Sequence, residues 1–121
     1  MRRKVFAVDD SRTMRAMLEA TLHAAGFDVA LAEDGQDGLD RIDRVAPDLV
    51  ITDLNMPRLD GFGFIEGVRA RERHRGLPIL VLTTESGAAL KMRAREVGAT
   101  GWIVKPFDDA KLVAAINRLV A

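Results

Sequence analysis

The sequence predicts an α/β fold, a small open doubly wound domain whose parallel sheet carries helices on both faces. Short apolar runs without polar alternation recur along the chain, as is typical of strands that are buried on both sides. Each run is followed by a longer segment whose apolar residues have helical spacing. The chain has 121 residues, well short of the roughly 250 that a closed α/β barrel needs.

In the first half of the chain, the apolar run at 4–8 precedes a helical segment that Gly26 is placed to end. The run at 29–32 rests more on its place in the alternation than on its composition, and Pro47 ends the helix after it. The apolar positions that mark these two helices are Met14, Met17, Leu18 and Leu22, and then Leu39, Ile42 and Val45.

In the second half, the run at 49–52 precedes a third helix, and the Arg-rich stretch RARERHR is predicted as its solvated end. The run at 79–82 precedes a helix closed by Gly98, and the run at 102–104 precedes a helix that Asp108 is placed to cap. The apolar positions are Phe62, Ile65 and Val68, then Leu90, Ala94 and Val97, and last Leu112, Ile116 and Leu119.

Composition excludes several classes of protein. Eighteen basic and eighteen acidic residues balance, so no basic stripe for nucleic acid is expected. The absence of cysteine excludes disulfides and thiolate metal sites. The N-terminal apolar run is broken at Asp9, too early for a signal peptide, and none approaches the roughly 20 residues of a membrane helix. We therefore expect a soluble cytoplasmic protein with no nucleic-acid or membrane partner.

Polar side chains follow four of the five predicted strands: Asp9 and Asp10, Asp53, Thr83 and Thr84, and Lys105 with Pro106. The carboxyl ends of parallel strands meet at one edge of a sheet, where ligands bind. Two like charges 4 Å apart repel by about 4 kcal/mol at an effective dielectric near 20, so three acids together need a cation. Oxygen ligands without His or Cys favour Mg²⁺. With a hydroxyl and an ammonium added, the set suits a phosphoryl group.

A carboxylate at the tip of an apolar strand allows three interpretations. Asp53 holds a metal beside a nucleotide, attacks a phosphate as an enzyme nucleophile, or accepts a phosphoryl group and keeps it. The chain has no G-x-x-x-x-G-K-[ST] loop, and the spacing of GFGFIEG does not fit a dinucleotide loop. His23 and His74 lie far apart near helix ends and are expected on the surface rather than as ligands.

Four segments, VDDSRTMR, ITDLNMPRLDGF, VLTTE and GWIVKPF, resemble the receiver domains of two-component response regulators, specifically the stand-alone chemotaxis type called CheY. The resemblance runs end to end. It implies a flavodoxin-like (βα)5 fold with the strand order 2-1-3-4-5. It also implies that residues 1–121 form a single receiver domain with no output domain.

The resemblance assigns roles to the residues at the strand ends. Asp53 would be the phosphoacceptor. Asp10, Asp53 and the main-chain carbonyl of Asn55 would bind Mg²⁺, and Asp9 would hold a metal-bound water. Lys105 would pair with the phosphoryl oxygens, and Pro106 would follow it through a cis peptide bond.

Other residues would read out or tune the reaction. Thr83 would donate its hydroxyl to a phosphoryl oxygen, and Trp102, where Tyr or Phe is more usual, would be the aromatic switch that moves with it. Asn55, Thr84 and Glu85 are the expected tuning positions, Thr84 being larger than the Ala, Gly or Ser that is frequent there. The expected partner face, over the fourth helix, fifth strand and fifth helix, comprises Lys91, Met92, Arg95, Trp102 and Lys111.

The resemblance implies a monomeric phosphoacceptor switch rather than an enzyme, with slow self-dephosphorylation. A chemotaxis-type histidine kinase would donate the phosphoryl group, and the flagellar motor switch protein or another phosphorylation-dependent target would bind the product. A phosphate sink or phosphorelay receiver is the alternative. A small aspartate-nucleophile phosphatase is disfavoured, because such enzymes typically have an acid two residues after the nucleophile, where this chain has Asn55.

Overall fold

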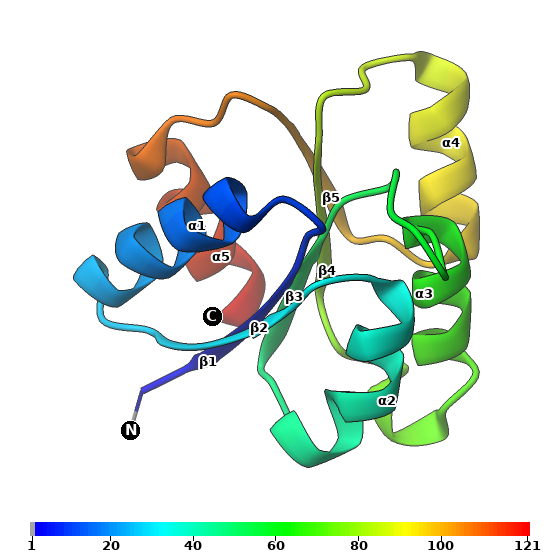
Figure 1. Cartoon of the computed structure of the whole chain (residues 1–121), viewed down its shortest axis with the longest axis horizontal. Coiled ribbons are helices and arrows are strands. Elements are labelled where there is room, and N and C mark those ends of the chain that lie inside the picture. The colour runs from blue at the N-terminus through cyan, green and yellow to red at the C-terminus, as the bar shows by residue number, and fades with distance from the viewer. Residues whose placement is uncertain (1) are drawn as a thin grey trace.

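In the computed structural model, which describes residues 2–121, five parallel strands form one sheet in the order β2-β1-β3-β4-β5 (Figure 1). This order confirms the flavodoxin-like topology. The strands are β1 Lys4–Val8, β2 Asp28–Ala32, β3 Leu49–Thr52, β4 Ile79–Thr83 and β5 Gly101–Val104.

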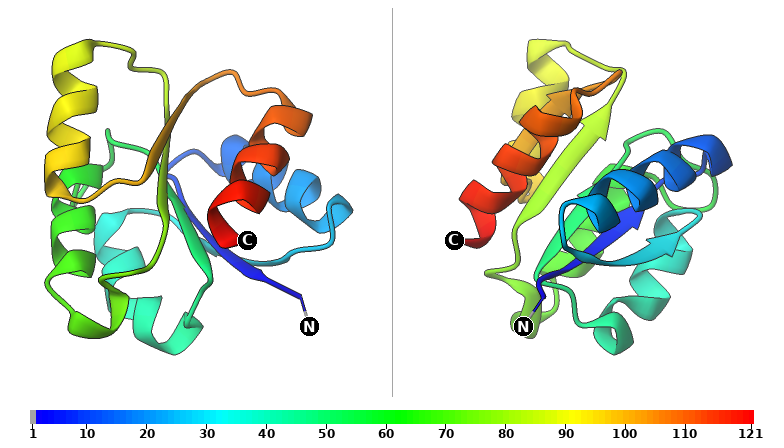
Figure 2. Two further views of the ribbon diagram at one scale, coloured as in Figure 1. Left: turned by 180° about the vertical axis from the view of Figure 1, so that it is seen from behind. Right: turned by 90° about the vertical axis from the view of Figure 1, so that its left-hand side faces the viewer.

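Within the same residues, α-helices follow the strands in strict alternation, and a short 3-10 helix, η1, lies between α3 and β4. Helices α1 and α5 cover one face of the sheet, and α2, α3 and α4 cover the other (Figures 1 and 2). The helices are α1 Arg12–Ala24, α2 Gly35–Val45, α3 Gly61–Arg69, η1 Glu72–His74, α4 Ala88–Val97 and α5 Asp109–Val120.

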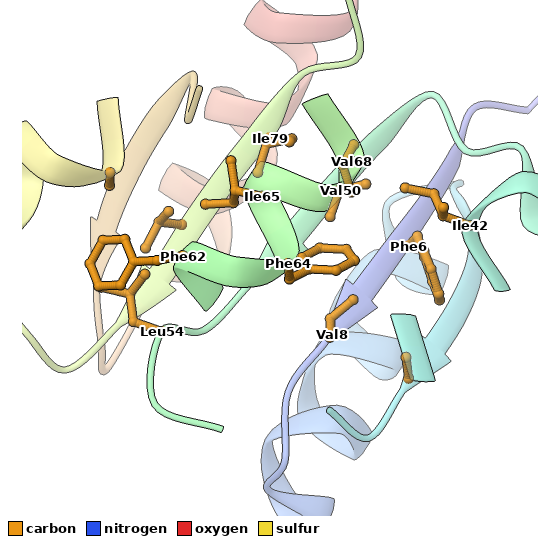
Figure 3. Close-up of a cluster of buried hydrophobic side chains, with 13 residues drawn as sticks. Phe6, Val8, Ile42, Val50, Leu54, Phe62, Phe64, Ile65, Val68 and Ile79 are labelled. Atoms are coloured by element: carbon orange, nitrogen blue, oxygen red, sulfur yellow. The ribbon is translucent and has the colours of Figure 1, made fainter. Parts of the chain in front are cut away.

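Each face of the sheet has its own hydrophobic core. Successive side chains of a strand point to opposite faces, so Phe6 and Val8 pack towards α2 and α3 (Figure 3). Val5 and Ala7 pack towards α1 and α5 on the other face. Burial of one such large apolar side chain contributes about 1.5–3 kcal/mol. The two-sided burial explains why the strands read as unbroken apolar runs.

Side-chain caps fix where the helices begin, and so where the loops at the carboxyl edge of the sheet end. Asp108 accepts a hydrogen bond from the Lys111 amide at 2.9 Å, as predicted for the start of α5. Asp60 caps α3 in the same way, at 2.8 Å from the Gly63 nitrogen. Gly98, with φ +119°, ends α4 as predicted.

Most predicted boundaries are correct to within one residue: β2 begins at Asp28, β4 includes Thr83, and β5 begins at Gly101. The prediction that His74 lies on the surface was wrong. The segment after α3 folds back as η1, and His74 is only 5% exposed. Its Nε2 lies 2.7 Å from Oδ1 of Asp43, which gives the buried imidazole a polar partner.

The other predicted surface histidine, His23, is exposed. Arg69, in the predicted solvated stretch, instead donates to the main-chain carbonyls of His74 and Gly98 and joins the ends of α3 and α4. Among residues 2–121, no helix is both long enough and apolar enough to span a membrane.

Candidate functional site

Three carboxylates meet where β1 and β3 end. These strands are parallel neighbours, with Val8 opposite Thr52, so the residues that follow them are adjacent. Asp9 is buried, Asp53 half-buried and Asp10 exposed, and each offers a carboxylate oxygen within 4.8 Å of the others. The structure thus brings together acids that are more than forty residues apart in the sequence.

An ammonium group joins two of these acids. Lys105, which follows β5, donates from Nζ to Oδ2 of Asp9 and to Oδ2 of Asp53, both at 2.8 Å. Burial would lower the pKa of Lys105, but its hydrogen bonds to Asp53 and Asp9 outweigh that effect and raise it. Lys105 therefore stays cationic in the site. The peptide bond between Lys105 and Pro106 is cis.

Further hydrogen bonds orient the acids. Oδ1 of Asp9 accepts from the Ser11 amide at 2.9 Å, and Oδ1 of Asp53 accepts from the Leu54 amide at 2.7 Å. The guanidinium of Arg15 donates to the main-chain carbonyl of Asp9 at 2.7 Å and ties the first turn of α1 to the end of β1. Asp9 and Asp53 therefore each present the other oxygen to Lys105.

The loop after Asp53 closes through Gly61. The Gly61 amide donates to the Leu54 carbonyl at 2.8 Å. A Cβ atom at Gly61 would lie 2.2 Å from the main-chain oxygen of Asp53 and 2.7 Å from Cα of Leu54. The turn that exposes the Asp53 carboxylate at the sheet edge therefore requires glycine at its far end.

Glu85 connects three residues that sequence analysis placed at the site. Its amide donates to the hydroxyl oxygen of the fully buried Thr83 at 3.4 Å, and its carboxylate accepts from the Asn55 side chain at 3.3 Å. Its main-chain carbonyl accepts from the indole nitrogen of Trp102 at 3.2 Å. Thr84, between Thr83 and Glu85, is exposed. The link from Glu85 to Trp102 was not predicted from the sequence.

The expected partner face surrounds Trp102. Lys91, Arg95 and Trp102 line one small cavity of about 80 Å³ between α4 and β5. Trp102 and Lys111 line a second, of about 530 Å³, between β5 and α5. Met92 is 64% exposed on the same side of α4. The five predicted residues thus line hollows on α4, β5 and α5, and their role as a partner face stays a prediction.

The residues at the strand ends suit a hard divalent cation. Three carboxylates and one ammonium leave two formal negative charges in excess. All available donors are oxygens, which Mg²⁺ prefers. The donor set therefore fits Mg²⁺.

Sequence analysis missed one charged pair beside the acids. Arg58, in the loop after Asp53, donates from Nε and Nη2 to the two carboxylate oxygens of Asp34, at 2.8 and 3.1 Å. The position of Asp34 before a helix was a local signal for its capping role. Its pairing with Arg58 spans 24 residues, and no local spacing rule reports such a contact.

Known proteins match both the sequence and the fold of this chain. Residues 5–117 match the family described as response regulator receiver domain. The chain therefore belongs to the receiver domains of two-component response regulators. Such domains are signalling switches that bind Mg²⁺ and take phosphoryl groups from histidine kinases, rather than enzymes in the usual sense.

Within that family the chain resembles chemotaxis proteins of the CheY type. It is 42% identical over 111 residues to chemotaxis protein CheY1 of Helicobacter pylori, covering 90% of each chain. The crystal structure of Vibrio cholerae CheY4 has a TM-score of 0.94 and 41% identity, over 98% of this chain and 99% of that one.

Other receivers are also similar. The receiver domain of the sensor histidine kinase PA1611 of Pseudomonas aeruginosa, solved with magnesium in its active-site cleft, has a TM-score of 0.92 at 27% identity, over 99% of this chain and 98% of that one. The probable transcriptional regulator ycf27 of Porphyridium aerugineum is 37% identical over 97% of this chain. The chain spans about half the length of ycf27, 48% of it.

Proposed function

We propose that this receiver is a phosphoacceptor switch in which Asp53 takes a phosphoryl group from a phosphohistidine of a histidine kinase. The observation that supports this most is the position of Lys105, whose ammonium lies 2.8 Å from both Asp9 and Asp53. A cation held by one acid beside a second, more accessible acid suits the transfer of an anionic group to that second acid.

The transfer is an in-line displacement. An Oδ of Asp53 forms a bond to phosphorus as the P–N bond to the kinase imidazole breaks, and the imidazole, already protonated on its other ring nitrogen, leaves as the neutral histidine side chain. Lys105 neutralises charge on the equatorial oxygens. Asp10, Asp53 and the main-chain carbonyl of Asn55 would hold Mg²⁺, with Asp9 acting through a water. The metal supplies further positive charge to the transferred group.

Readout passes through Thr83, Glu85 and Trp102. The Thr83 hydroxyl accepts from the Glu85 amide and remains free to donate its proton to a phosphoryl oxygen. Any shift of this segment reaches Trp102, because its indole is bound to the Glu85 carbonyl. Phosphorylation then biases the surface around Lys91, Met92, Arg95, Trp102 and Lys111 towards its partner-binding state.

Water ends the signal by hydrolysing the acyl phosphate. Asn55, Thr84 and Glu85 stand beside the site and would set the rate, Asn55 and Glu85 through their mutual hydrogen bond. Because Asn55 occupies the place of a phosphatase acid, hydrolysis is expected to be slow and limited to the protein's own phosphate.

The similarity to CheY proteins supports a role in chemotaxis. A chemotaxis-type histidine kinase is then the donor and the flagellar motor switch protein the target. The proposal needs one copy of the chain and only the receiver domain of residues 1–121, because every site residue comes from it. The similarity to ycf27, a probable transcriptional regulator, leaves a receiver with another output as the second candidate. A binding screen with and without a phosphate mimic separates them, because only the motor regulator gains affinity for the motor switch protein.

The direct test is labelling by a small phosphodonor with Mg²⁺. We expect about one phosphoryl group per chain in the wild type and none in Asp53→Asn, whereas Asp40→Asn, an exposed acid on α2, labels normally. Steady release of phosphate far beyond one equivalent would instead indicate a phosphatase.

A further inference from the structure

The loop between β3 and α3 carries a backbone feature that the proposed chemistry does not use. Arg58 has a φ of +68°, in the left-handed region that residues other than Gly and Asn rarely occupy. Such conformations persist where surrounding contacts hold them, and they cluster at functional sites.

Asp34 holds the Arg58 side chain from across the site. The guanidinium meets the carboxylate through two parallel hydrogen bonds of 2.8 and 3.1 Å. Asp34 is only 4% exposed, and its Oδ1 also accepts from the Asp37 amide to cap α2. The hydrogen bonds from Arg58 lower the pKa of Asp34, so the buried carboxylate remains ionised and paired.

A main-chain contact strengthens the same junction. The Gly35 amide donates to the Leu59 carbonyl at 3.1 Å. A Cβ at Gly35 would lie 2.1 Å from that oxygen, so the approach is as close as glycine permits. The second half of the loop, residues 57–60, is thus fixed to the start of α2 at two consecutive residues, Arg58 and Leu59.

This junction stands beside the metal-binding acids. Asp10, Arg15, Asp34, Pro57 and Arg58 all line one cavity of about 430 Å³. The first half of the same loop, residues 54–56, includes Asn55, whose main-chain carbonyl is a proposed metal ligand. The Gly61–Leu54 hydrogen bond joins the two ends of the loop. Because the ends are joined, anchoring the second half of the loop restricts the first half as well.

We propose that the Arg58–Asp34 pair is a positioning clamp that holds the loop of residues 54–60 ready for the divalent cation, so that Arg58 sets the Mg²⁺ affinity without touching the metal. This inference rests on the proposed function and deepens it. Groups that orient metal ligands typically change metal affinity about 10–100-fold when removed. Without the clamp, the cation must order the loop as it binds.

The sign of the effect separates positioning from simple charge. Arg58 is a cation near a site for a cation, so its loss would by electrostatics alone strengthen Mg²⁺ binding. The clamp predicts the opposite. Calorimetric titration with Mg²⁺ alone should show about tenfold weaker binding for Arg58→Ala. The matched control, Arg71→Ala, removes an ion pair with Asp43 elsewhere on α2 and should bind Mg²⁺ as the wild type does.

Two more variants isolate the cause. Arg58→Gly relieves the strain of the left-handed backbone but also removes the two hydrogen bonds to Asp34. It should therefore bind Mg²⁺ about as weakly as Arg58→Ala. Arg58→Lys keeps the charge without the two-pronged geometry, and it should fall between wild type and Arg58→Ala even if the alanine variant folds poorly. In the metal-free proteins, amide exchange of residues 54–60 should be faster in Arg58→Ala.

Wild-type or tighter Mg²⁺ affinity in folded Arg58→Ala would overturn the clamp, as would full recovery in Arg58→Gly. Asp10→Asn separates this failure from that of the proposed function. If Asp10→Asn bound Mg²⁺ as well as the wild type, the metal site itself would be misplaced and the clamp would fall with it.

Discussion

The indole N–H of Trp102 donates a hydrogen bond to the main-chain carbonyl of Glu85, 3.2 Å away, across the gap between β5 and the segment that follows β4. Glu85 lies two residues after Thr83 and also binds its hydroxyl. Trp102 is therefore attached to the segment expected to move when Asp53 is phosphorylated. It is also the only tryptophan in the sequence, which makes it a natural reporter.

Trp102 fluorescence should change when beryllofluoride and Mg²⁺ are added, because rearrangement of residues 83–85 alters the hydrogen bond and the exposure of the indole. Emission spectra over a titration check this. Asp53→Asn should give no change under the same conditions. A flat wild-type signal at saturation would argue against Trp102 as the switch.

Lys105→Ala should slow phosphoryl transfer by about 10²-fold or more, since it removes a preorganised cation from the transferred oxygens. Mg²⁺ affinity should not fall, because the ammonium group that the substitution removes repels the metal in the wild type. Initial labelling rates at saturating Mg²⁺ measure the first effect and calorimetric titration with Mg²⁺ measures the second, with urea unfolding to confirm the fold. Labelling at the wild-type rate would show that Lys105 only bridges the acids.

Gly61→Ala should lower the free energy of unfolding by about 2 kcal/mol, within the 1–3 kcal/mol typical of overpacking, because the new methyl meets the Asp53 carbonyl. Urea denaturation measures it. Gly76→Ala is the control: a Cβ there would meet no atom of the described residues within 4 Å. Equal stability of the two variants would contradict the close approach at Gly61.

Asp43 gives a pH-dependent prediction. Its hydrogen bond with His74, helped by Arg71, holds the pKa of Asp43 below its ordinary value of 3.8. A lowered folded-state pKa gives stability that is complete above the unfolded pKa and is lost as pH falls through the folded one. The stability advantage of wild type over Asp43→Asn should therefore be constant above about pH 5 and shrink below pH 3.8. Urea unfolding at stepped pH checks this; an advantage that does not diminish as the pH falls below 3.8 would contradict it.

The sheet and its acidic edge could be predicted because they follow from chain order. Apolar runs at regular intervals define parallel strands, and the carboxyl ends of such strands must share an edge. The proximity of Asp9, Asp10, Asp53 and Lys105 therefore follows from the sequence alone. Helix caps such as Asp108 also follow local rules.

The contacts that sequence reasoning missed are side-chain contacts between residues that lie far apart in the sequence. His74 reaches Asp43 across 31 residues, and Arg58 reaches Asp34 across 24. In the sequence His74 lies in a stretch that was predicted to be solvated, and no local pattern links Arg58 to Asp34. The burial of His74 in η1 and the left-handed backbone at Arg58 accompany these pairings, and neither can be derived from the local sequence.

The central claim is that Asp53 accepts the phosphoryl group. Peptide mass spectrometry of the protein after reaction with a small phosphodonor and Mg²⁺ tests it most directly, because it identifies the modified residue. The account predicts a single labile acyl phosphate on Asp53, absent when Mg²⁺ is chelated. A phosphoryl group on any other residue, or none on Asp53 at saturating donor and Mg²⁺, would contradict it.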